Sequence, residues 1–251
     1  MKTFILNIIA ITLLFSTTRA CWSKLSGCAK DIAIGGDGTV WVVGCNSVAG
    51  GYDIYRYDKT TGNWYANTRG AVRIAADKDG YAWIVNSDGD ISQLTKSGWA
   101  SVRGCAKDIG IGGDGTVWIV GCDSVDGGYG IYEYIDATGE WEQKGEGAVR
   151  IAADKDGYAW VVRSNGEIFQ LTTSGWTKIP GHATDIGVGS DGTVWVLASM
   201  PVEAGYNIYR WNGSLKNYWT TVAGAAVNIA VAPDSHAWVV NQFGEIFQGS
   251  C

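Results

Sequence analysis

The stretch that decides the fold is Cys28-Ala-Lys-Asp-Ile-Ala-Ile-Gly-Gly-Asp-Gly-Thr-Val-Trp41, because the chain contains it more than once. It returns almost unchanged as Cys105–Trp118 and in altered form as His182–Trp195, so successive copies start 77 residues apart. A fixed period of this kind marks a repeat architecture in which each copy is one supersecondary unit. The period therefore sets the fold, and it predicts that any binding site occurs more than once.

A shorter motif lies between the long copies and doubles the number of units. It reads Arg73-Ile-Ala-Ala-Asp-Lys-Asp-Gly-Tyr-Ala-Trp83 and recurs as Arg150–Trp160 and Asn228–Trp238. The alternation produces six half-units, each marked by one tryptophan: Trp41, Trp83, Trp118, Trp160, Trp195 and Trp238. Most half-units continue with an Ile-Tyr or Ile-Phe stretch, and all but the last then have a segment carrying Trp. This pattern predicts four short strands joined by Gly-rich turns.

The first 20 residues have the pattern of a secretory signal peptide. Lys2 supplies the positive start, an apolar run too short for a membrane span follows, and Thr18-Arg19-Ala20 precedes a cleavage point at Cys21. We therefore expect a secreted, extracellular protein in which 21–251 form a single domain. Divided among six units, these residues amount to roughly 38 per unit, a suitable length for a four-stranded propeller blade.

The composition narrows the possible partners. The chain has 13 Trp and 12 Tyr but only 5 Phe, and aromatic rings with a polar edge suit both blade interfaces and sugar-facing surfaces. The formal net charge is −6 and no basic stripe is visible, so we expect no nucleic-acid partner. No later stretch is long and apolar enough to predict a membrane span. Asn212 begins an Asn-Gly-Ser sequon, a glycosylation acceptor in a eukaryotic host.

The six cysteines are an even number, as expected for disulfides in a secreted protein. Six cysteines allow about 15 disulfide connectivities, but a comparison of the repeats distinguishes among them. The third long copy has His182 and Ser199 at the two positions where the first two copies have cysteines, so both cysteines are missing together. The predicted pairs are therefore Cys28–Cys45 and Cys105–Cys122.

Hairpin geometry agrees with this pairing. A hairpin centred between Gly36 and Asp37 sets Cys28 opposite Cys45, and cross-strand neighbours are close enough for a disulfide.

The two remaining cysteines, Cys21 and Cys251, are the ends of the expected mature chain. Trp22 aligns with the tryptophans that end the short units, whereas the last unit stops before its own tryptophan. We therefore predict that the N-terminal strand completes the last blade and that a Cys21–Cys251 disulfide locks the closure.

These features predict an all-β fold, a six-bladed β-propeller of four-stranded antiparallel blades closed by the N-terminal strand. A β-sandwich does not require six near-equal units. A β-solenoid requires capped ends, whereas the two ends of this chain complement each other.

The pattern Gly-x-Gly-x-Asp-Gly-x-x-Trp-x-Val, followed by Gly-x-Ile-Phe-Gln and a further Trp, resembles the tectonin β-propeller repeat over essentially all of 21–251. A signal peptide followed by six such repeats is similar to the secreted tectonin-type lectins, which include fish-egg lectins and a horseshoe-crab lectin that binds bacterial surfaces. The resemblance implies multivalent binding of cell-surface or microbial glycans, in innate defence or an egg or cell coat, without catalysis. The alternation of long and short units departs from six equivalent repeats, so the number of binding sites is either three or six.

A ring of polar residues is expected where the innermost strands begin, at the mouth of the central tunnel. Acid and base alternate at these positions, which are Asp31, Arg73, Asp108, Arg150, Asp185 and Asn228. One interpretation is a structural salt-bridge ring, and the other is a ligand or ion site. No cofactor is required, but Asp185 beside Asn228 lacks an arginine on one side, which favours a cation such as Ca²⁺ there.

The long units also carry insertions between the second and third strands, at 44–52, 121–129 and 198–206. These loops share one face with the polar ring, and loops on a rigid scaffold commonly carry binding sites. Aromatic rings for stacking and planar amide or carboxylate groups for hydroxyls favour sugar binding. The candidates are Asn46, Tyr52 and Asp53, then Asp123, Asp126 and Tyr129, then Glu203, Tyr206 and Asn207. The alternative is that these tyrosines only pack beneath the loops.

The sequence thus predicts a multivalent secreted lectin whose partners are glycans on cells or microbes. The alternative is an extracellular structural or protein-interaction propeller. Asp77-Lys-Asp-Gly80 resembles part of a calcium loop but lacks the further acids, so a type I turn explains it better. No Ser/His/Asp set, zinc cluster or phosphate loop is present in the sequence, and we therefore expect no enzyme and no metal site beyond the alternative of a Ca²⁺ at the tunnel mouth.

Overall fold

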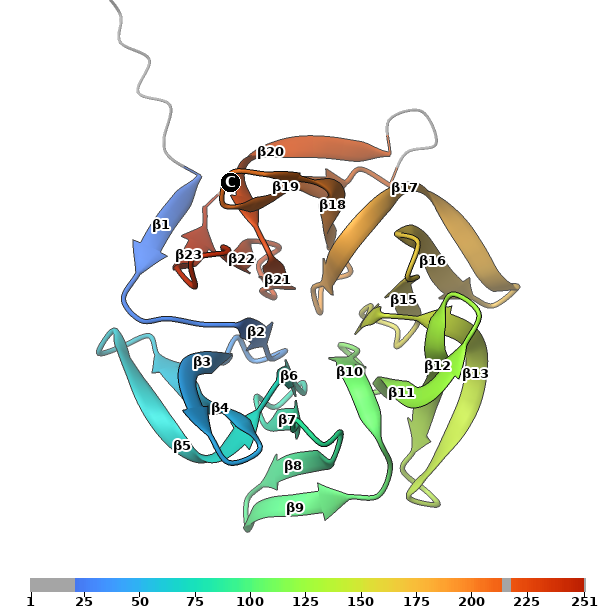
Figure 1. Ribbon diagram of the computed structural model, residues 1–251, viewed down its shortest axis with the longest axis horizontal. Coiled ribbons are helices and arrows are strands. Elements are labelled where there is room, and N and C mark those ends of the chain that lie inside the picture. Colours follow the sequence, from blue (N-terminus) through green and yellow to red (C-terminus); the bar gives the residue numbers. More distant parts are fainter. Residues whose placement is uncertain (1–20, 214–217, 251) are drawn as a thin grey trace, which may run out of the picture.

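The computed structural model describes residues 21–213 and 218–250. Strands and turns make up these residues, without a helix among them, and hence without a helix that could cross a membrane. The 23 strands of this described part form five antiparallel sheets, which Figure 1 shows arranged around a common centre. This is a propeller-type architecture. The predicted signal peptide and Cys251 lie outside the described residues.

Three of the sheets are four-stranded meanders whose first strand is innermost. The first contains β2 (Asp31–Ile34), β3 (Val40–Val48), β4 (Gly51–Asp58) and β5 (Asn63–Ala71). The second contains β6 (Arg73–Ala76), β7 (Ala82–Val85), β8 (Ile91–Thr95) and β9 (Gly98–Val102). The third contains β10 (Ala106–Ile111), β11 (Val117–Val125), β12 (Gly128–Ile135) and β13 (Glu140–Ala148).

The next sheet has seven strands. In order they are β14 (Arg150–Ala153), β15 (Ala159–Val162), β16 (Glu167–Thr172), β17 (Gly175–Val188), β18 (Val194–Val202), β19 (Gly205–Trp211) and β20 (Trp219–Ala226). The long strand β17 pairs with β16 through its first part and with β18 through its last part.

The remaining sheet joins the two ends of the described chain. It contains β21 (Asn228–Val231), β22 (Ala237–Val240), β23 (Ile246–Gly249) and β1 (Trp22–Leu25). β1 pairs with β23 in a register that sets Trp22 opposite Gly249. The Ser250 amide also donates a hydrogen bond to the Cys21 carbonyl at 2.9 Å. The N-terminal strand therefore lies where the alignment of Trp22 predicted it.

The two hairpin disulfides are confirmed, but the predicted hairpin register is wrong by one residue. Cys28 and Cys45 are bonded with a Cα–Cα distance of 5.7 Å, and Cys105–Cys122 is equivalent at 5.6 Å. In the first hairpin Ile34 pairs with Val40, which centres the turn on Asp37 rather than before it.

A β-bulge explains how the cysteines still meet. In the second copy the register shifts between Ala106 and Asp108, so one extra residue, Lys107, lies on the inner strand and restores the alignment of the cysteines. The third copy has the same shift between Ala183 and Asp185 although it lacks both cysteines. The bulge is therefore a property of the strand pair and does not depend on the disulfide.

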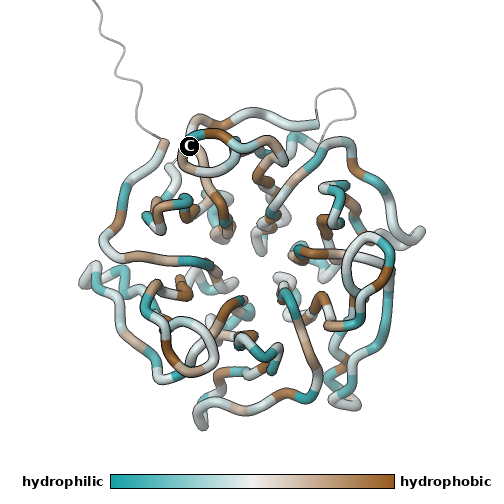
Figure 2. The backbone as a smooth tube through the Cα atoms, viewed as in Figure 1, coloured by the Kyte–Doolittle hydropathy of each residue, from teal (hydrophilic) through white to brown (hydrophobic). Residues whose placement is uncertain are grey.

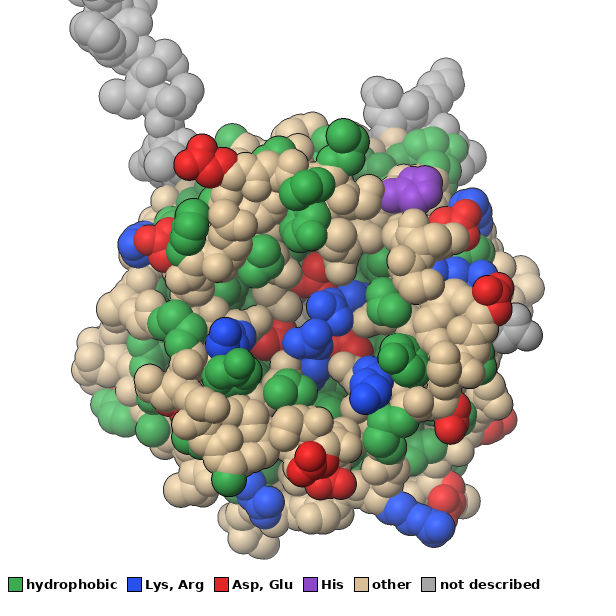
Figure 3. Space-filling model, in the orientation of Figure 1, with side chains coloured by type: hydrophobic (Ala, Val, Ile, Leu, Met, Phe, Trp, Pro, Cys, Tyr) green, Lys and Arg blue, Asp and Glu red, His purple; other side chains and the backbone are tan. Residues whose placement is uncertain are grey.

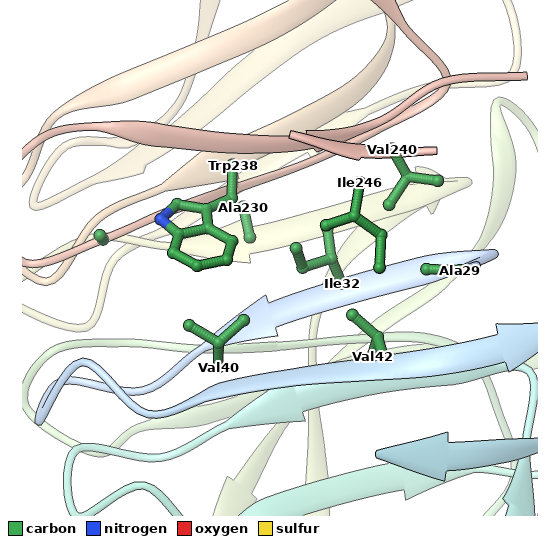
Figure 4. Packing of buried hydrophobic residues seen from close by; sticks show 9 residues of the cluster. Ala29, Ile32, Val40, Val42, Ala230, Trp238, Val240 and Ile246 are labelled. Atoms are coloured by element: carbon green, nitrogen blue, oxygen red, sulfur yellow. The ribbon is translucent and has the colours of Figure 1, made fainter. Parts of the chain in front are cut away.

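Apolar side chains fill the spaces between neighbouring sheets. Figure 2 shows the hydrophobic residues concentrated in the inner strands and the hydrophilic ones toward the rim. In the cluster of Figure 4, Ile32, Val40 and Val42 of one sheet face Trp238 and Val240 of the next. The six tryptophans that mark the repeats are between 1% and 3% exposed, which confirms that they belong to the core.

A second set of tryptophans, on the outermost strands, links each sheet or meander to its neighbour. Each indole Nε1 donates a hydrogen bond to the preceding unit. The pairs are Trp64 to Ser26 O, Trp99 to Asn67 Oδ1, Trp141 to Arg103 O, Trp176 to Lys144 O, Trp219 to Pro180 O and Trp22 to Ala223 O. At Gly224 an added Cβ would lie 2.7 Å from Trp22 Nε1, so the close approach requires glycine.

Candidate functional site

The polar ring predicted at the start of the innermost strands is present and ties these strands together. Its acids are 4% to 6% exposed, and Figure 3 shows Lys and Arg side chains gathered at the centre of this face. Each acid accepts a hydrogen bond from the backbone amide of the next innermost strand. The pairs are Asp31–Ile74 at 3.0 Å, Asp108–Ile151 at 2.9 Å and Asp185–Ile229 at 3.0 Å, and Asn228 accepts from Ile32 at 3.0 Å.

The two arginines bridge to the acid that follows them in the chain. Arg73 Nε lies 3.2 Å from Asp108 Oδ1, and Arg150 Nε lies 3.2 Å from Asp185 Oδ1. Each arginine therefore reaches the acid of the next innermost strand around the ring. The residue that precedes Asp31 in this order is Asn228, so Asp31 has no arginine ion pair among the described residues. The sequence predicted that Asp185, beside Asn228, lacks an arginine on one side, and the structure shows that Asp185 has an ion pair with Arg150 on its other side. The sequence does not reveal which neighbouring acid each guanidinium reaches.

These contacts favour the structural interpretation of the ring. Below it the innermost strands enclose a cavity of about 90 Å³ lined by Ile, Ala, Gly and Val. Within 21–213 and 218–250 no group of three or more His, Cys, Asp or Glu is arranged to hold a metal ion. Asp185 and Asn228 already use their oxygens on Arg150 and on backbone amides.

Burial makes two of the ring acids sensitive to pH. It raises the pKa of Asp185 to about 7, although Arg150 opposes the shift. Burial also raises the pKa of Asp31, against the opposing charges of Arg73 and Arg150 and with Asp108 acting in the same direction. An Asp in an unfolded chain titrates near about 4. As the pH rises from about 4 to about 7, the unfolded state loses protons that the folded state keeps, so stability falls and then levels off.

We therefore expect the melting temperature to be lower at pH 8 than at pH 5, and the decrease to be smaller in Asp31→Asn. Asparagine keeps an acceptor for the Ile74 amide and cannot become charged. Thermal unfolding followed by circular dichroism at both pH values measures the change, with the exposed Asp126→Asn as control. The half-buried Asp58 and Glu167 have a lowered pKa and so act only at lower pH. A decrease of equal size in wild type and Asp31→Asn would contradict the prediction.

The candidate residues of the three long loops separate into two groups. Tyr52, Tyr129 and Tyr206 are half-buried and pack against hydrophobic clusters beneath the loops. Lys30 Nζ lies 4.5 Å from the centre of the Tyr52 ring. These tyrosines therefore follow the alternative interpretation, in which they support the loops.

The first loop nevertheless contributes to a cavity of about 300 Å³. Asn46 Nδ2 donates to Asp53 Oδ2 at 2.8 Å, and the Tyr55 hydroxyl donates to the same oxygen at 2.6 Å. Asn46 and Tyr55 line the cavity together with Trp64, and Ile246 of β23 completes it from the neighbouring sheet. The site thus lies at the junction between two sheets.

Sequence reasoning missed Tyr55 and Trp64, although a signal for both was available. Residues two apart on a strand share a face, so Asp53 and Tyr55 lie together on β4. Trp64 lies on the outermost strand of its long unit, at the position that Trp99 and Trp22 occupy in short units. The residues of the neighbouring sheet had no such signal, because they are distant in sequence.

The other two long loops carry different polar groups. In the second, the Tyr132 hydroxyl donates to Asp123 Oδ2 at 3.1 Å, while Asp126 is exposed at the loop tip. In the third, Met200 replaces Asn46 and is 76% exposed. Glu203 is exposed and Asn207 is half-buried. The three loops are therefore not equivalent as binding surfaces.

Two further cavities lie at sheet junctions of the same kind. One, of about 290 Å³, is lined by Trp176, Phe169 and Arg163, with the guanidinium 4.6 Å from the centre of the Phe169 ring. The other, of about 200 Å³, is lined by Trp22 and Phe247 together with Asn241 and other residues. Each cavity joins an outer tryptophan, a second aromatic ring and a polar side chain. Outside them, Asn212 of the predicted sequon is exposed, and Ser214 lies outside the described residues.

Comparison with known proteins supports this architecture. The family model of the tectonin domain matches residues 147–250, whereas no curated protein matches the chain. A streptogramin B lyase structure is similar with a TM-score of 0.58 and 16% identity over 90% of this chain and 96% of that chain. A structure of YCF48 bound to D1 peptide has a TM-score of 0.57 and 15% identity over 89% and 77%. The chain is therefore an all-β propeller-type protein, and its resemblance to the tectonin repeat family is confirmed over residues 147–250.

Proposed function

We propose that the chain is a six-bladed propeller whose ring closes through β1. The pairing of β1 with β23 supports closure. The seven-stranded sheet is consistent with two four-stranded blades that share β17, because the first part of this strand carries the outer Trp176 and the last part carries the inner Asp185. In this scheme 21–251 form one domain that follows a signal peptide at 1–20.

We further propose that this propeller is a secreted lectin that binds glycans on cells or microbes and performs no catalysis. The observation that carries the proposal is the cavity lined by Asn46, Tyr55 and Trp64. Indole and phenol rings suit the apolar C–H face of a sugar ring, while the amide and the adjacent carboxylate of Asp53 suit its hydroxyls. The two hairpin disulfides are compatible with an extracellular location.

Repetition of the junction cavities supports multivalency. Three cavities of about 200 to 300 Å³ combine an outer tryptophan with a polar group, and they occur at different junctions around the molecule. Several weak sites on one rigid body raise the affinity for a surface that displays many glycans.

The lectin proposal predicts that Asn46→Ala weakens glycan binding by about tenfold, because a sugar hydroxyl loses its partner in a partly enclosed site. A glycan array identifies the ligand, and calorimetry with that ligand measures the affinity of each variant. Tyr55→Phe removes only the hydroxyl and is expected to act in the same direction. The exposed Ser47→Ala in the same loop is the matched control.

Absence of binding to every glycan, combined with tight binding to an extracellular protein, would instead support the structural or protein-interaction propeller. Unchanged affinity in folded Asn46→Ala and Tyr55→Phe would place the sugar elsewhere.

A further inference from the structure

A cavity of about 330 Å³ lies on the opposite face from the long loops, between the second and third sheets. It is bounded by the turn between β6 and β7 and by the turn between β10 and β11, at the far ends of the innermost strands. Its charged lining consists of five acids and one base: Asp77, Asp79, Asp114, Glu133, Asp136 and Lys78. No site described above uses this cavity.

An unpartnered buried donor in the wall points to a ligand. Trp83 lines the cavity and is 3% exposed, yet its indole Nε1 has no hydrogen-bond partner within 21–213 and 218–250. Asp77 uses Oδ1 for the amides of Asp79 and Tyr81, whereas Oδ2 has no partner among the described residues. A ligand hydroxyl that accepts from the indole and donates to this carboxylate would satisfy both groups.

The equivalent position in another unit shows a different arrangement. There, Trp160 Nε1 donates directly to Asp154 Oδ2 at 3.4 Å. The same tryptophan and aspartate types are therefore hydrogen-bonded to each other in one unit, whereas in the other unit no hydrogen bond joins them among the described residues.

The charge of this cavity is special to the middle long copy. Glu133 lies opposite Trp118 in the strand register, and the residues opposite the matching tryptophans in the other copies are Arg56 and Arg210. Asp136 lies 77 residues after Lys59, one repeat period, so the first copy has a base there as well. The copies share the same strands and turns, but the charge at the edge of this position is negative in the middle copy and positive in the first copy. A charged ligand would therefore distinguish between the copies.

The bases near the cavity neutralise only part of the acid. Lys78 Nζ is 3.0 Å from Asp79 Oδ2, and Lys144 Nζ is 3.4 Å from Glu133 Oε2. Asp136 has no ion pair among the described residues, and Asp114 uses its carboxylate on the backbone and hydroxyl of Thr116. The cavity therefore remains net negative.

We propose that this cavity binds a protonated amino sugar. The ammonium lies among the carboxylates at the edge, near Glu133 and Asp136, where the opposite charge is concentrated. The sugar ring packs on Tyr134, whose ring centre is 5.8 Å from that of Trp83 in an edge-on arrangement. One hydroxyl bridges Trp83 Nε1 and Asp77 Oδ2. A metal ion is a poorer occupant, because no metal-holding group of acids is found in the described part of the chain.

The experiment compares D-glucosamine with N-acetylglucosamine, since acetylation removes the charge and keeps the ring. Isothermal titration at low salt is expected to show glucosamine binding at least about tenfold more tightly, an advantage that added salt reduces. The double variant Glu133→Arg, Asp136→Lys reproduces the charges of the first copy and is expected to abolish this preference. Glu140→Gln, an exposed acid on β13 outside the cavity, is the matched control.

Several outcomes would overturn the proposal. They are equal affinity for the two sugars, and an unchanged preference in the folded double variant. If the double variant does not fold, the single Glu133→Gln must still lower glucosamine affinity by about threefold or more, and failure to do so also overturns it. Asn46→Ala is expected to leave glucosamine binding intact, so failure of this site and failure of the proposed loop-face lectin site are distinguishable.

Discussion

Trp22→Ala is expected to lower the free energy of unfolding by about 3–5 kcal/mol, the range found when a large packed aromatic side chain is removed. Trp22 packs against the cluster that contains Trp195 and Ile229, and its indole donates to Ala223 O. β1 has only four residues, so this side chain is a large part of the apolar surface by which it packs on the rest of the molecule, beside its pairing with β23. Detachment of β1 also leaves β23 as an unprotected sheet edge, which favours aggregation.

Urea unfolding followed by tryptophan fluorescence and circular dichroism measures this effect. Trp99→Ala is the matched comparison, because Trp99 occupies the same outer-strand position in a sheet of consecutive strands. Ser23→Ala, at an exposed position of β1, is expected to change nothing. A loss below about 1 kcal/mol in Trp22→Ala, together with a large loss in Trp99→Ala, would show that β1 docks weakly and would contradict closure through this strand.

Asp108→Ala is expected to lower the free energy of unfolding by about 3–5 kcal/mol, because it removes one partner of a buried ion pair and leaves the other partner buried without an opposite charge. Arg73 would lose its carboxylate, and the Ile151 amide would lose its acceptor. With Asp108 only 6% exposed, water replaces these contacts poorly. Chemical unfolding at pH 7 measures the loss.

Asp31→Asn is the matched control for this prediction. Asp31 has no arginine ion pair in the part of the chain that the structure describes, asparagine still accepts from the Ile74 amide, and the ring already contains an asparagine at residue 228. We expect its effect at pH 7 to be small or even stabilising. Equal losses in Asp108→Ala and Asp31→Asn would mean that the acids act only as hydrogen-bond acceptors and that the ion pairs contribute little.

The repeat structure was predictable because each repeat is encoded by a continuous stretch of the sequence. Each unit forms its own hairpins from residues close in the chain, so the order of strands and the buried tryptophans followed from pattern alone. The pairing of Cys28 with Cys45 was predictable for a similar reason, since both cysteines disappear together from the third copy. The position of β1 followed from a single aligned tryptophan, Trp22.

The details of the candidate sites were less predictable, because they depend on small shifts between segments. The bulge at Lys107 shifts the register of β10 against β11 by one residue, and no residue type at that position predicts it. The direction in which Arg73 reaches around the ring depends on the rotation between adjacent sheets. The sequence therefore could not show that Asp31 is the ring acid without an arginine ion pair among the described residues.

By itself, the sequence determined the period, the all-β class, two disulfides and the core tryptophans, because each depends on contacts within a unit or on a comparison between units. Only the tertiary structure decided which side chains share a cavity. Trp64 meets Ile246, and Trp83 meets Glu133, across junctions between sheets whose strands are far apart in the chain. Such contacts are set by the angle and spacing at which whole sheets pack, a property that no single repeat contains.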